Sequence, residues 1–494
     1  MHTLSRFMSA NFRPWWLANL AYLRPRLHFL GIKIILKPQF LIPILYTACT
    51  IVFNLVGVHS VTQAGVRAAH ISLITLFLLF WASDHEFGAR LLGVTLGTYQ
   101  SIHRISAFMA GIQAVVHVII TTQNIKFSVS DASQFYGLMT GCMFLSLLFL
   151  PMVRRRVYEV FLWTHQGCAI FVLYAIWRHV DSSVSKRWVC MLAITCAATG
   201  VLQIVRIIFR NLASRNKLVR YTMETLGNDI CRVTLLLPKP WKVHAGERVR
   251  LSIPQMGLLH IFQLHPFATV WWENDKNGAA VSISLLIRAR SGFTRTLLDR
   301  SVVGQKGWAW IDGPYGPSYV GPFGYVGEVG DYGHLFMAAT GIGIVAQLPY
   351  IKEILDGRLA GQVRTQRILL VWQIEQDGDW EAARDWLQAL VKQDNGYMLK
   401  VIIYNQMESS SNAPGLVGHH DLITIYGGEV NWEQQLSLEL KEQIGTLLIM
   451  VSTQRSVRTI MMQLAKRNVK QKVELFELEF QPWSSPNNRL CALI

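Results

Sequence analysis

Apolar residues gather into six long runs within the first 210 positions of the chain and thin out after that. The runs lie near residues 40–58, 68–83, 103–121, 135–151, 161–176 and 188–209. Four of them approach the roughly 20 apolar residues that a helix needs to cross a bilayer, and the second and fifth are shorter. The pattern predicts six membrane-spanning helices.

After about residue 215 the pattern changes to short segments separated by turn residues. Residues 232–255 and 279–298 read as strands of an antiparallel barrel. From residue 334 on, apolar strands alternate with helical stretches, which predicts a doubly wound α/β domain. We therefore expect an N-terminal cytosolic segment at 1–39, a membrane domain at 40–210, a barrel at 215–325 and an α/β domain at 330–494.

The charge follows the same division. Residues 1–220 carry the whole net charge of +16, because they contain 21 Lys and Arg but only 5 Asp and Glu. A basic excess confined to a membrane half argues against a nucleic-acid-binding protein. The basic residues gather in alternate loops, so the positive-inside rule predicts that both termini face the cytosol. The N-terminus lacks a signal-peptide pattern, and the seven cysteines show no CxxC spacing.

Two histidine pairs interrupt the apolar pattern. The segments HRISAFMAGIQAVVH and HQGCAIFVLYAIWRH place His103 with His117 and His165 with His179, each pair with thirteen residues between. Fourteen positions turn a helix by about 1400°, close to four turns, so each pair shares a face and spans about 21 Å. On antiparallel helices, His103 would face His165 at the cytosolic depth, and His117 would face His179 at the outer depth.

One imidazole from each side of a flat macrocycle is what bis-histidine ligation of haem iron requires. A structural role for membrane histidines, bonded to backbone or to an ion, would not explain the repeated spacing. We therefore expect two b-type haems, with His103, His117, His165 and His179 as axial ligands of the iron.

This spacing and the His-Arg start of the first segment resemble the ferric reductase and NADPH oxidase superfamily of flavocytochromes b, in its fungal ferric-chelate reductase branch. The resemblance covers about residues 65–483. It implies a six-helix, bis-haem membrane domain followed by a cytosolic ferredoxin-reductase-like module. That module would consist of an antiparallel β-barrel that binds FAD and an α/β domain that binds NADPH.

Three segments resemble the flavin-binding elements of this superfamily. HPFAT matches a His-Pro-Phe-Ser/Thr element, with an alanine where a hydroxyl residue often stands. SGFT resembles the segment that approaches the FAD phosphates, where glycine allows close backbone approach, and DGPYG resembles the turn that closes the flavin domain. The FAD-binding residues so implied are His265, Pro266, Phe267, Ala268, Thr269, Gly292, Phe293, Thr294, Gly313 and Tyr315.

The segment HLFMAATGIGIVAQLPYIKEIL reads as an apolar strand, a glycine turn and a helix, the order that a nucleotide pyrophosphate site requires. It lacks the third glycine of a Rossmann fingerprint but resembles the nicotinamide-nucleotide motif of the superfamily. The NADPH-binding residues so implied are Thr340, Gly341, Ile342, Gly343, Ile344 and, at the end of a later strand, Ser452.

Two departures from the family pattern concern the nucleotide site. Residues 452–454 read Ser-Thr-Gln where the family carries Cys-Gly-Pro. Glu375 and Asp377 stand near where a basic residue would hold a 2′-phosphate. NADPH is therefore implied by the resemblance, whereas the local charge leaves NADH open.

The C-terminus carries two further features. Glu479, Phe480 and Trp483 resemble the terminal Glu…Phe…Trp strand of the family, whose aromatic residue lies near the flavin. Cys491 begins a C-a-a-X sequence, the pattern of a prenylation site, although a chain that already crosses the bilayer gains little from a lipid.

Together these features predict an integral membrane oxidoreductase. Electrons would pass from cytosolic NADPH through FAD and two haems to an acceptor across the plasma membrane or an internal membrane, by family a ferric or cupric chelate. No catalytic acid or base is expected, because hydride transfer depends on alignment. Three alternatives stay open: an oxidase that forms superoxide, a reductase of an organic substrate in specialised metabolism, and a haem protein with a decayed nucleotide domain. The oligomeric state is left open.

Overall fold

The computed structural model of the chain divides into two compact units, Met1–Ile204 and Val205–Ile494. It describes residues 26–29, 32–35, 38–82, 84–92, 96–124, 127–154, 157–212, 218–227, 229–257, 264–290, 292–300, 305–316, 329–376, 378–394, 397–408, 415–417, 422–468 and 471–478.

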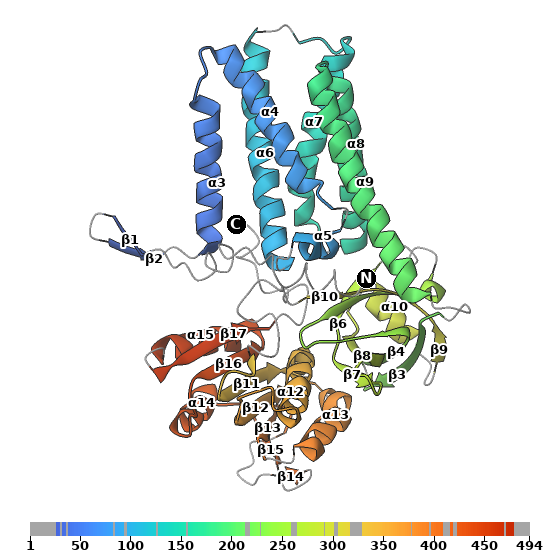
Figure 1. Cartoon of the computed structure of the whole chain (residues 1–494), viewed down its shortest axis with the longest axis vertical. Helices are drawn as coiled ribbons and strands as arrows, with labels where there is room; N and C mark the ends of the chain where they lie inside the picture. The colour runs from blue at the N-terminus through green and yellow to red at the C-terminus, as the bar shows by residue number, and fades with distance from the viewer. Residues whose placement is uncertain are drawn as a thin grey trace. The chain divides into compact units, whose positions relative to one another are not determined.

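The first unit is built from long apolar helices that run along one another (Figure 1). A short antiparallel hairpin of β1 (Arg26–Phe29) and β2 (Ile32–Ile35), which the apolar pattern did not predict, precedes them. The helices are α3 (Pro38–Leu55), α4 (Val61–Leu79), α5 (His85–Leu92), α6 (Leu96–Asn124), α7 (Ala132–Phe149) with the 3-10 turn η1 (Leu150–Met152), α8 (Tyr158–His179) and α9 (Ser183–Asn211).

Five of these helices, α4 and α6 to α9, are long and apolar enough to cross a bilayer, which confirms five of the six predicted spans. In α3 the side chains are described from Ile44 on, and the apolar stretch Ile44–Leu55 is shorter than a span. The first span therefore stays a prediction. Helices α6 and α9 extend to 29 residues each because polar residues continue them beyond their apolar runs. The short helix α5 was not predicted.

Small and polar side chains hold the helices of the first unit together. Ser72 Oγ in α4 donates a hydrogen bond to the Ala110 carbonyl of α6 at 2.9 Å. A Cβ on Gly65 would lie 2.8 Å from Ile120 Cγ2, so α4 and α6 approach closely there. Such contacts drive helix association in lipid, where apolar contact alone gives little. Ile170, which is 70% exposed, is one of many large apolar side chains on the outside, as a lipid-facing surface requires.

Antiparallel strands begin at residue 220. They form a five-stranded sheet in the order β7-β8-β4-β3-β9 and a three-stranded sheet in the order β10-β5-β6, around one apolar core. The predicted antiparallel architecture is thus confirmed, with its strands divided into two sheets. The elements are β3 (Arg220–Leu226), β4 (Ile230–Trp241), β5 (Arg248–Ser252), η2 (Pro254–Met256), β6 (His265–Ala268), β7 (Trp271–Asn274), β8 (Ala280–Arg288), α10 (Phe293–Asp299), β9 (Gln305–Trp308) and β10 (Trp310–Tyr315).

The last part of the chain is a seven-stranded sheet in the order β14-β15-β13-β12-β11-β16-β17, parallel except at β14. Its elements are β11 (His334–Thr340), η4 (Gly341–Gly343), α12 (Ile344–Leu359), β12 (Arg367–Ile374), α13 (Asp379–Gln393), β13 (Leu399–Asn405), β14 (Gly415–Val417), β15 (Ile423–Gly427), α14 (Trp432–Lys441), β16 (Leu447–Ser452), α15 (Arg455–Arg467) and β17 (Val473–Glu477).

Helices cover both faces of this sheet (Figure 1). Within β11, Leu335 and Met337 belong to the core that α12 and α13 cover, whereas Phe336 and Ala338 belong to the core that α14 and α15 cover. Successive side chains of a strand point to opposite faces, so an unbroken apolar run needs a cover on each side. The predicted doubly wound α/β domain is confirmed.

The antiparallel sheets and the parallel sheet pack on each other within the second unit. Trp271 of β7 stacks on Trp386 of α13 with ring centres 5.9 Å apart, and Arg232 lies over the same Trp386 ring at 4.4 Å. His244 Nδ1 lies 2.8 Å from Glu353 Oε1, and this hydrogen bond raises the pKa of His244. Stacked rings and charged pairs thus join the two domains.

The last turn of α9 is tied to β10, also within the second unit. The fully buried Asn211 side chain donates to the Ile311 carbonyl at 2.6 Å and accepts from the Ile311 amide at 2.8 Å. Arg206 Nη2 donates to the Pro314 carbonyl at 3.3 Å. One amide side chain therefore satisfies both backbone groups of a strand residue and anchors the end of the helix.

A buried ion pair at the amino ends of the parallel strands provides a test of this fold. Glu439 of α14 is 5% exposed, and it accepts hydrogen bonds from His334 at 2.8 Å and Arg367 at 2.5 Å. Burial opposes its ionisation, but these hydrogen bonds lower the pKa of Glu439 to about 2. The ionised Glu439 therefore stabilises the fold fully at a pH above the ordinary pKa of a glutamate, and this stabilisation is lost as the pH falls toward 2.

We predict that Glu439→Gln destabilises the α/β domain by about 1–3 kcal/mol, because it removes the carboxylate bonded to the buried His334 and leaves Arg367 with only the exposed Glu442. The measurement is thermal unfolding of the full chain in detergent at pH 7 and at steps down to pH 3. The wild-type advantage should shrink as the pH falls. Glu433→Gln, on the same helix in an exposed pair with Arg467, should change the melting temperature little. Equal effects of the two variants would contradict the prediction.

Candidate functional site

The predicted nucleotide turn joins β11 to α12. Strand β11 ends at Thr340, the turn η4 follows, and α12 begins at Ile344. Gly341 has a φ of +49°, in the left-handed region that favours glycine. All five predicted residues from Thr340 to Ile344, including Ile342, are buried at this turn. The strand, the glycine turn and the helix are in the predicted order.

Gly343 brings the start of α12 against the end of β16. A Cβ on Gly343 would collide with the Ser452 carbonyl oxygen, so no side chain fits there. Within this described stretch no side chain caps α12, and the Ile344 amide donates to the carbonyls of Gly341 and Ile342. The start of such a helix favours an anion. Because β11 pairs with β12 on one side and with β16 on the other, the turn lies where the strand order reverses. Open α/β sheets bind ligands at this point.

Ser452 is part of the core rather than of the open side of the turn. It is 1% exposed, and its Oγ accepts a hydrogen bond from Gln347 Nε2 at 2.8 Å and donates to the Ala338 carbonyl at 3.3 Å. Thr340 Oγ1 accepts a hydrogen bond from the Gln454 amide at 2.9 Å. A contact between Ser452 and a nucleotide would therefore come from its backbone.

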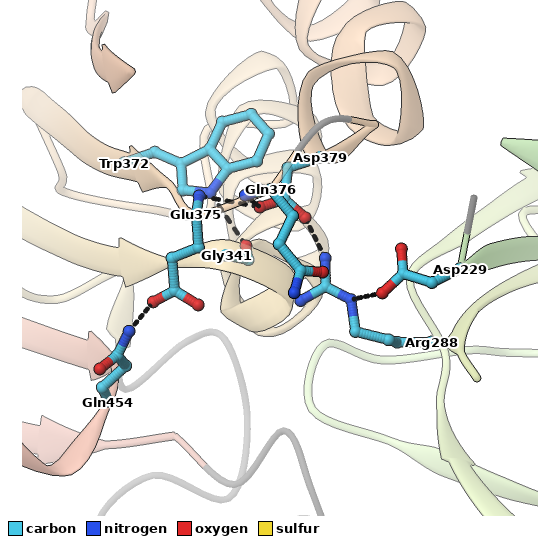
Figure 2. A network of polar contacts seen from close by, with 8 residues as sticks. All are labelled: Asp229, Arg288, Gly341, Trp372, Glu375, Gln376, Asp379 and Gln454. Atoms are coloured by element: carbon cyan, nitrogen blue, oxygen red, sulfur yellow. Dashed lines mark hydrogen bonds and ion pairs between the residues drawn. The ribbon is translucent and has the colours of Figure 1, made fainter. Parts of the chain in front are cut away.

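Polar contacts surround the turn (Figure 2). Trp372 Nε1 donates to the Gly341 carbonyl at 2.9 Å, which fixes the turn from the neighbouring strand. Glu375, directly after β12, accepts a hydrogen bond from the Gln454 side chain. The carboxyl ends of β11, β12 and β16 are thus joined by side chains.

An arginine from the antiparallel part reaches the same edge (Figure 2). Arg288 of β8 pairs with Asp229 at 3.0 Å and with Asp379. Asp379 in turn accepts from the amides of Glu375 at 3.0 Å and Gln376 at 3.2 Å. Sequence reasoning missed Arg288 and Asp379, because their partners are distant in the chain; Asp377 lies outside the described residues.

Two of the predicted flavin segments meet in one aromatic cluster. His265 of β6 stacks on Phe293 at the start of α10, with ring centres 4.2 Å apart and planes inclined by 9°. Phe267 lies 6.3 Å from the same Phe293 ring. The HPF and GFT segments, which are separated by two strands, therefore lie together.

The other residues of these segments shape the backbone around the cluster. Gly292 has a φ of +59° directly before α10, and Thr294 Oγ1 accepts a hydrogen bond from the Arg290 amide at 3.0 Å. Pro266 and Ala268 lie opposite arginines of β5 in the antiparallel register, and Thr269 is 2% exposed.

Gly313 and Tyr315 lie in β10, on the other side of β5 from the aromatic cluster. A Cβ on Gly313 would lie 3.1 Å from the Arg248 carbonyl oxygen, so this position favours glycine. Tyr315 is 1% exposed, and its hydroxyl donates to Asp312 at 2.5 Å. Arg206 of α9 lies over the Tyr315 ring at 4.7 Å. The structure therefore places Tyr315 in the anchor of α9.

The four paired histidines lie on α6 and α8 as two facing pairs. The ring centres of His103 and His165 are 6.3 Å apart, and those of His117 and His179 are also 6.3 Å apart. His85 of α5 was set aside in the sequence because it lacks a partner at matching spacing. Its ring lies 4.7 Å from that of His103. A separate short helix brings it there, so no spacing rule could have found it.

Each histidine of the second pair has a backbone partner. His117 Nδ1 lies 3.0 Å from the Gly65 carbonyl oxygen, and His179 Nδ1 lies 2.8 Å from the Ser133 carbonyl oxygen. A carbonyl can only accept, so Nδ1 carries the proton in both rings. A Cβ on Gly137 would lie 2.8 Å from the His179 ring, which explains the glycine there.

Some predicted features lie outside the described residues, among them Glu479, Phe480, Trp483 and Cys491. Among the described residues, no group of three or more His, Cys, Asp or Glu side chains could hold a metal ion by itself. The histidine pairs could bind a metal only within a group that supplies the remaining ligands, as a haem does.

Two family models match the part of the chain that follows the apolar helices. Residues 332–478 match the family model of the ferric reductase NAD binding domain, and residues 215–319 match an FAD-binding domain. Among solved structures, an Amycolatopsis cytochrome P450 reductase has 15% identity and a TM-score of 0.37 over 53% of this chain and 70% of its own.

The curated relatives include ferric and cupric reductases of yeasts. The chain is 26% identical over 366 residues to ferric/cupric reductase transmembrane component 2 of Saccharomyces cerevisiae, covering 71% of this chain and 47% of the relative. It is 26% identical over 271 residues to ferric reductase transmembrane component 1 of Schizosaccharomyces pombe, covering 45% of this chain and 43% of the relative. The chain thus spans about half the length of these relatives. With its apolar helices, the chain thus combines an FAD-binding domain with a ferric reductase NAD binding domain and is similar to ferric and cupric reductases of yeasts.

Proposed function

We propose that the chain is a transmembrane oxidoreductase that moves electrons from a reduced nicotinamide nucleotide through FAD and two b-type haems to a ferric or cupric chelate across the membrane. One observation carries this proposal: two pairs of facing histidines occur in the same chain as an FAD-binding domain and a NAD-binding domain. The proposal includes the domain limits 1–39, 40–210, 215–325 and 330–494, cytosolic termini and a plasma-membrane location.

The separation of the facing rings fits a metal between them. A metal–nitrogen bond of about 2.0 Å on each side, plus about 1.1 Å from each nitrogen to its ring centre, spans about 6.2 Å. Both pairs have ring centres 6.3 Å apart. Direct packing of two imidazoles would not need the same separation at two levels of the bundle.

The hydrogen bonds of the second pair also favour iron ligation. With Nδ1 of His117 and His179 protonated and bound to carbonyl oxygens, Nε2 keeps its lone pair for the metal. A bond from the other ring nitrogen to a carbonyl also fixes the orientation of the ring. Gly65 of α4 and Ser133 of α7 would therefore act as positioning residues for the two ligands.

The first pair supports the same assignment in another way. Among the described residues, the Nδ1 atoms of His103 and His165 are buried and without a hydrogen-bond partner. A buried polar atom without a partner costs free energy. An iron held by these nitrogens would supply the partner that they lack.

When bound, FAD converts a two-electron hydride into single electrons, and the haem irons carry single electrons through the apolar layer. The chain supplies binding and alignment. The first turn of α12 would bind the nucleotide pyrophosphate, and the His265, Phe267 and Phe293 cluster would hold the flavin. No side chain is required to move a proton for the hydride step.

The intact strand, turn and helix at Gly341–Gly343 and the fully bonded Ser452 hydroxyl support a working nucleotide site rather than a decayed one. The names of the yeast relatives support a ferric or cupric acceptor. Oxygen and organic acceptors are the competing possibilities.

Acceptor choice is tested with the purified full chain loaded with FAD and haem. We expect that NADH or NADPH reduces the haem bands, and that ferric chelate or cupric ion reoxidises them faster than air does. Superoxide is measured in parallel. Faster reoxidation by oxygen, with superoxide released in proportion, would make the protein an oxidase and contradict the proposed acceptor.

We predict that His117→Ala removes about half of the haem absorbance, because one of the two iron sites loses a ligand. Acceptor reduction should be lost, whereas the nucleotide should still reduce the flavin. His59→Ala is the control, because His59 is exposed in a loop. A full two-haem reduced spectrum and normal ferric reduction in His117→Ala would contradict the haem assignment.

We predict that Gly343→Ala slows nucleotide-dependent flavin reduction by on the order of 100-fold, because the added methyl group displaces α12 from the Ser452 carbonyl and misaligns the nucleotide. FAD content and reduction by dithionite should be unchanged. Gly357→Ala, later in the same helix, meets only the Val363 side chain and should keep the wild-type rate. A normal rate in Gly343→Ala would place the nucleotide elsewhere.

A further inference from the structure

The carboxylate of Glu375 lies directly over the nucleotide turn. In the parallel register Thr340 of β11 is opposite Gln373 of β12, so Glu375 follows its strand at the same edge as Gly341. A Cβ built on Gly341 would lie 2.5 Å from Glu375 Oε2 and 3.0 Å from Glu375 Cδ. Glycine at position 341 is therefore what leaves room for this carboxylate.

Hydrogen bonds fix the orientation of this carboxylate (Figure 2). The Gln454 side chain donates to Oε1 of Glu375, which leaves Oε2 as the oxygen that faces Gly341. The Glu375 amide donates to Asp379 at 3.0 Å, which fixes the backbone. The backbone of Gln454 is fixed as well, because its backbone amide donates to Thr340 Oγ1.

Carboxylates outnumber guanidinium groups among the residues that are bonded together beside the turn. Arg288 Nη1 lies 3.5 Å from a Cβ built on Gly341, so one guanidinium reaches the turn. Two other nitrogens of Arg288 pair with Asp229 and Asp379. Together with Glu375, three carboxylates thus stand beside one guanidinium that two of them already neutralise.

A carboxylate at the end of the second strand, beside the glycine turn, accepts hydrogen bonds from the hydroxyl groups of an adenosine ribose. A 2′-phosphate at the same place offers no such donor and carries a charge of about −1.5 to −2 at pH 7, which the carboxylate repels. A charged site can gain selectivity by repelling one ligand as well as by attracting another.

We propose that Glu375, held by Gln454, makes this site select NADH over NADPH. The proposal rests on the proposed function, in which this turn binds the nucleotide. It departs from the NADPH that the family resemblance implies. Glu375 is a specificity-determining residue here and takes no part in the hydride step.

The test compares two probes that differ only in the 2′-phosphate, adenosine 5′-monophosphate and adenosine 2′,5′-bisphosphate, by calorimetry on the full chain loaded with FAD and haem. We expect the wild type to bind the monophosphate at least about tenfold more tightly. Glu375→Gln, which keeps the shape and removes the charge, should reduce this ratio to within about threefold. Glu381→Gln removes an exposed charge from α13 and should keep the wild-type ratio.

Equal or tighter binding of the bisphosphate by the wild type would overturn the proposal, since Arg288 would then meet the phosphate. An unchanged ratio in Glu375→Gln would also overturn it. Anaerobic flavin reduction by NADH and by NADPH tests the proposed function separately. If neither nucleotide reduces the flavin, the proposed function fails, and the probe affinities still decide the role of Glu375.

Discussion

The α/β domain depends on one constraint, the close approach of backbone segments at the turn Gly341–Gly343. Gly343 lies against the Ser452 carbonyl, and Gly341 turns with a positive φ beneath the Glu375 carboxylate. Without side chains at these two positions, the start of α12 reaches the reversal point of the sheet, where a helix N-terminus favours a phosphate. The Trp372 hydrogen bond to Gly341 and the buried Gln347–Ser452 pair then hold the two neighbouring strands around the turn.

A comparable logic applies in the helical unit, where backbone groups of neighbouring helices orient the histidines. A histidine in an apolar layer needs a partner for each ring nitrogen. For His117 and His179 the carbonyls of Gly65 and Ser133 accept from one nitrogen each, and the other nitrogen would bind the proposed iron. The glycine at 137 gives the His179 ring its room. The two histidines are thus oriented by helices that carry none of the four paired histidines.

The second unit is held together by contacts between residues far apart in the chain. Arg288 links the antiparallel sheet to the edge of the parallel sheet, and Trp271 stacks on Trp386 between the same two domains. Asn211 ties the end of α9 to β10 by both polar groups of Ile311. The proposed electron transfer requires fixed separations, and contacts of this kind would supply them within this unit.

The sequence by itself determined the helical half, the antiparallel and doubly wound parts, the histidine spacing and the glycine turn. These follow from local periodicity and from residue types that only certain backbones accept. Only the tertiary structure decided that His85 lies beside His103, that Tyr315 belongs to the α9 anchor, and that Ser452 turns into the core. It also brought Arg288, Asp379 and Gln454 to Glu375. Such pairings depend on how strands and helices distant in the chain come together, and no spacing along one segment records that.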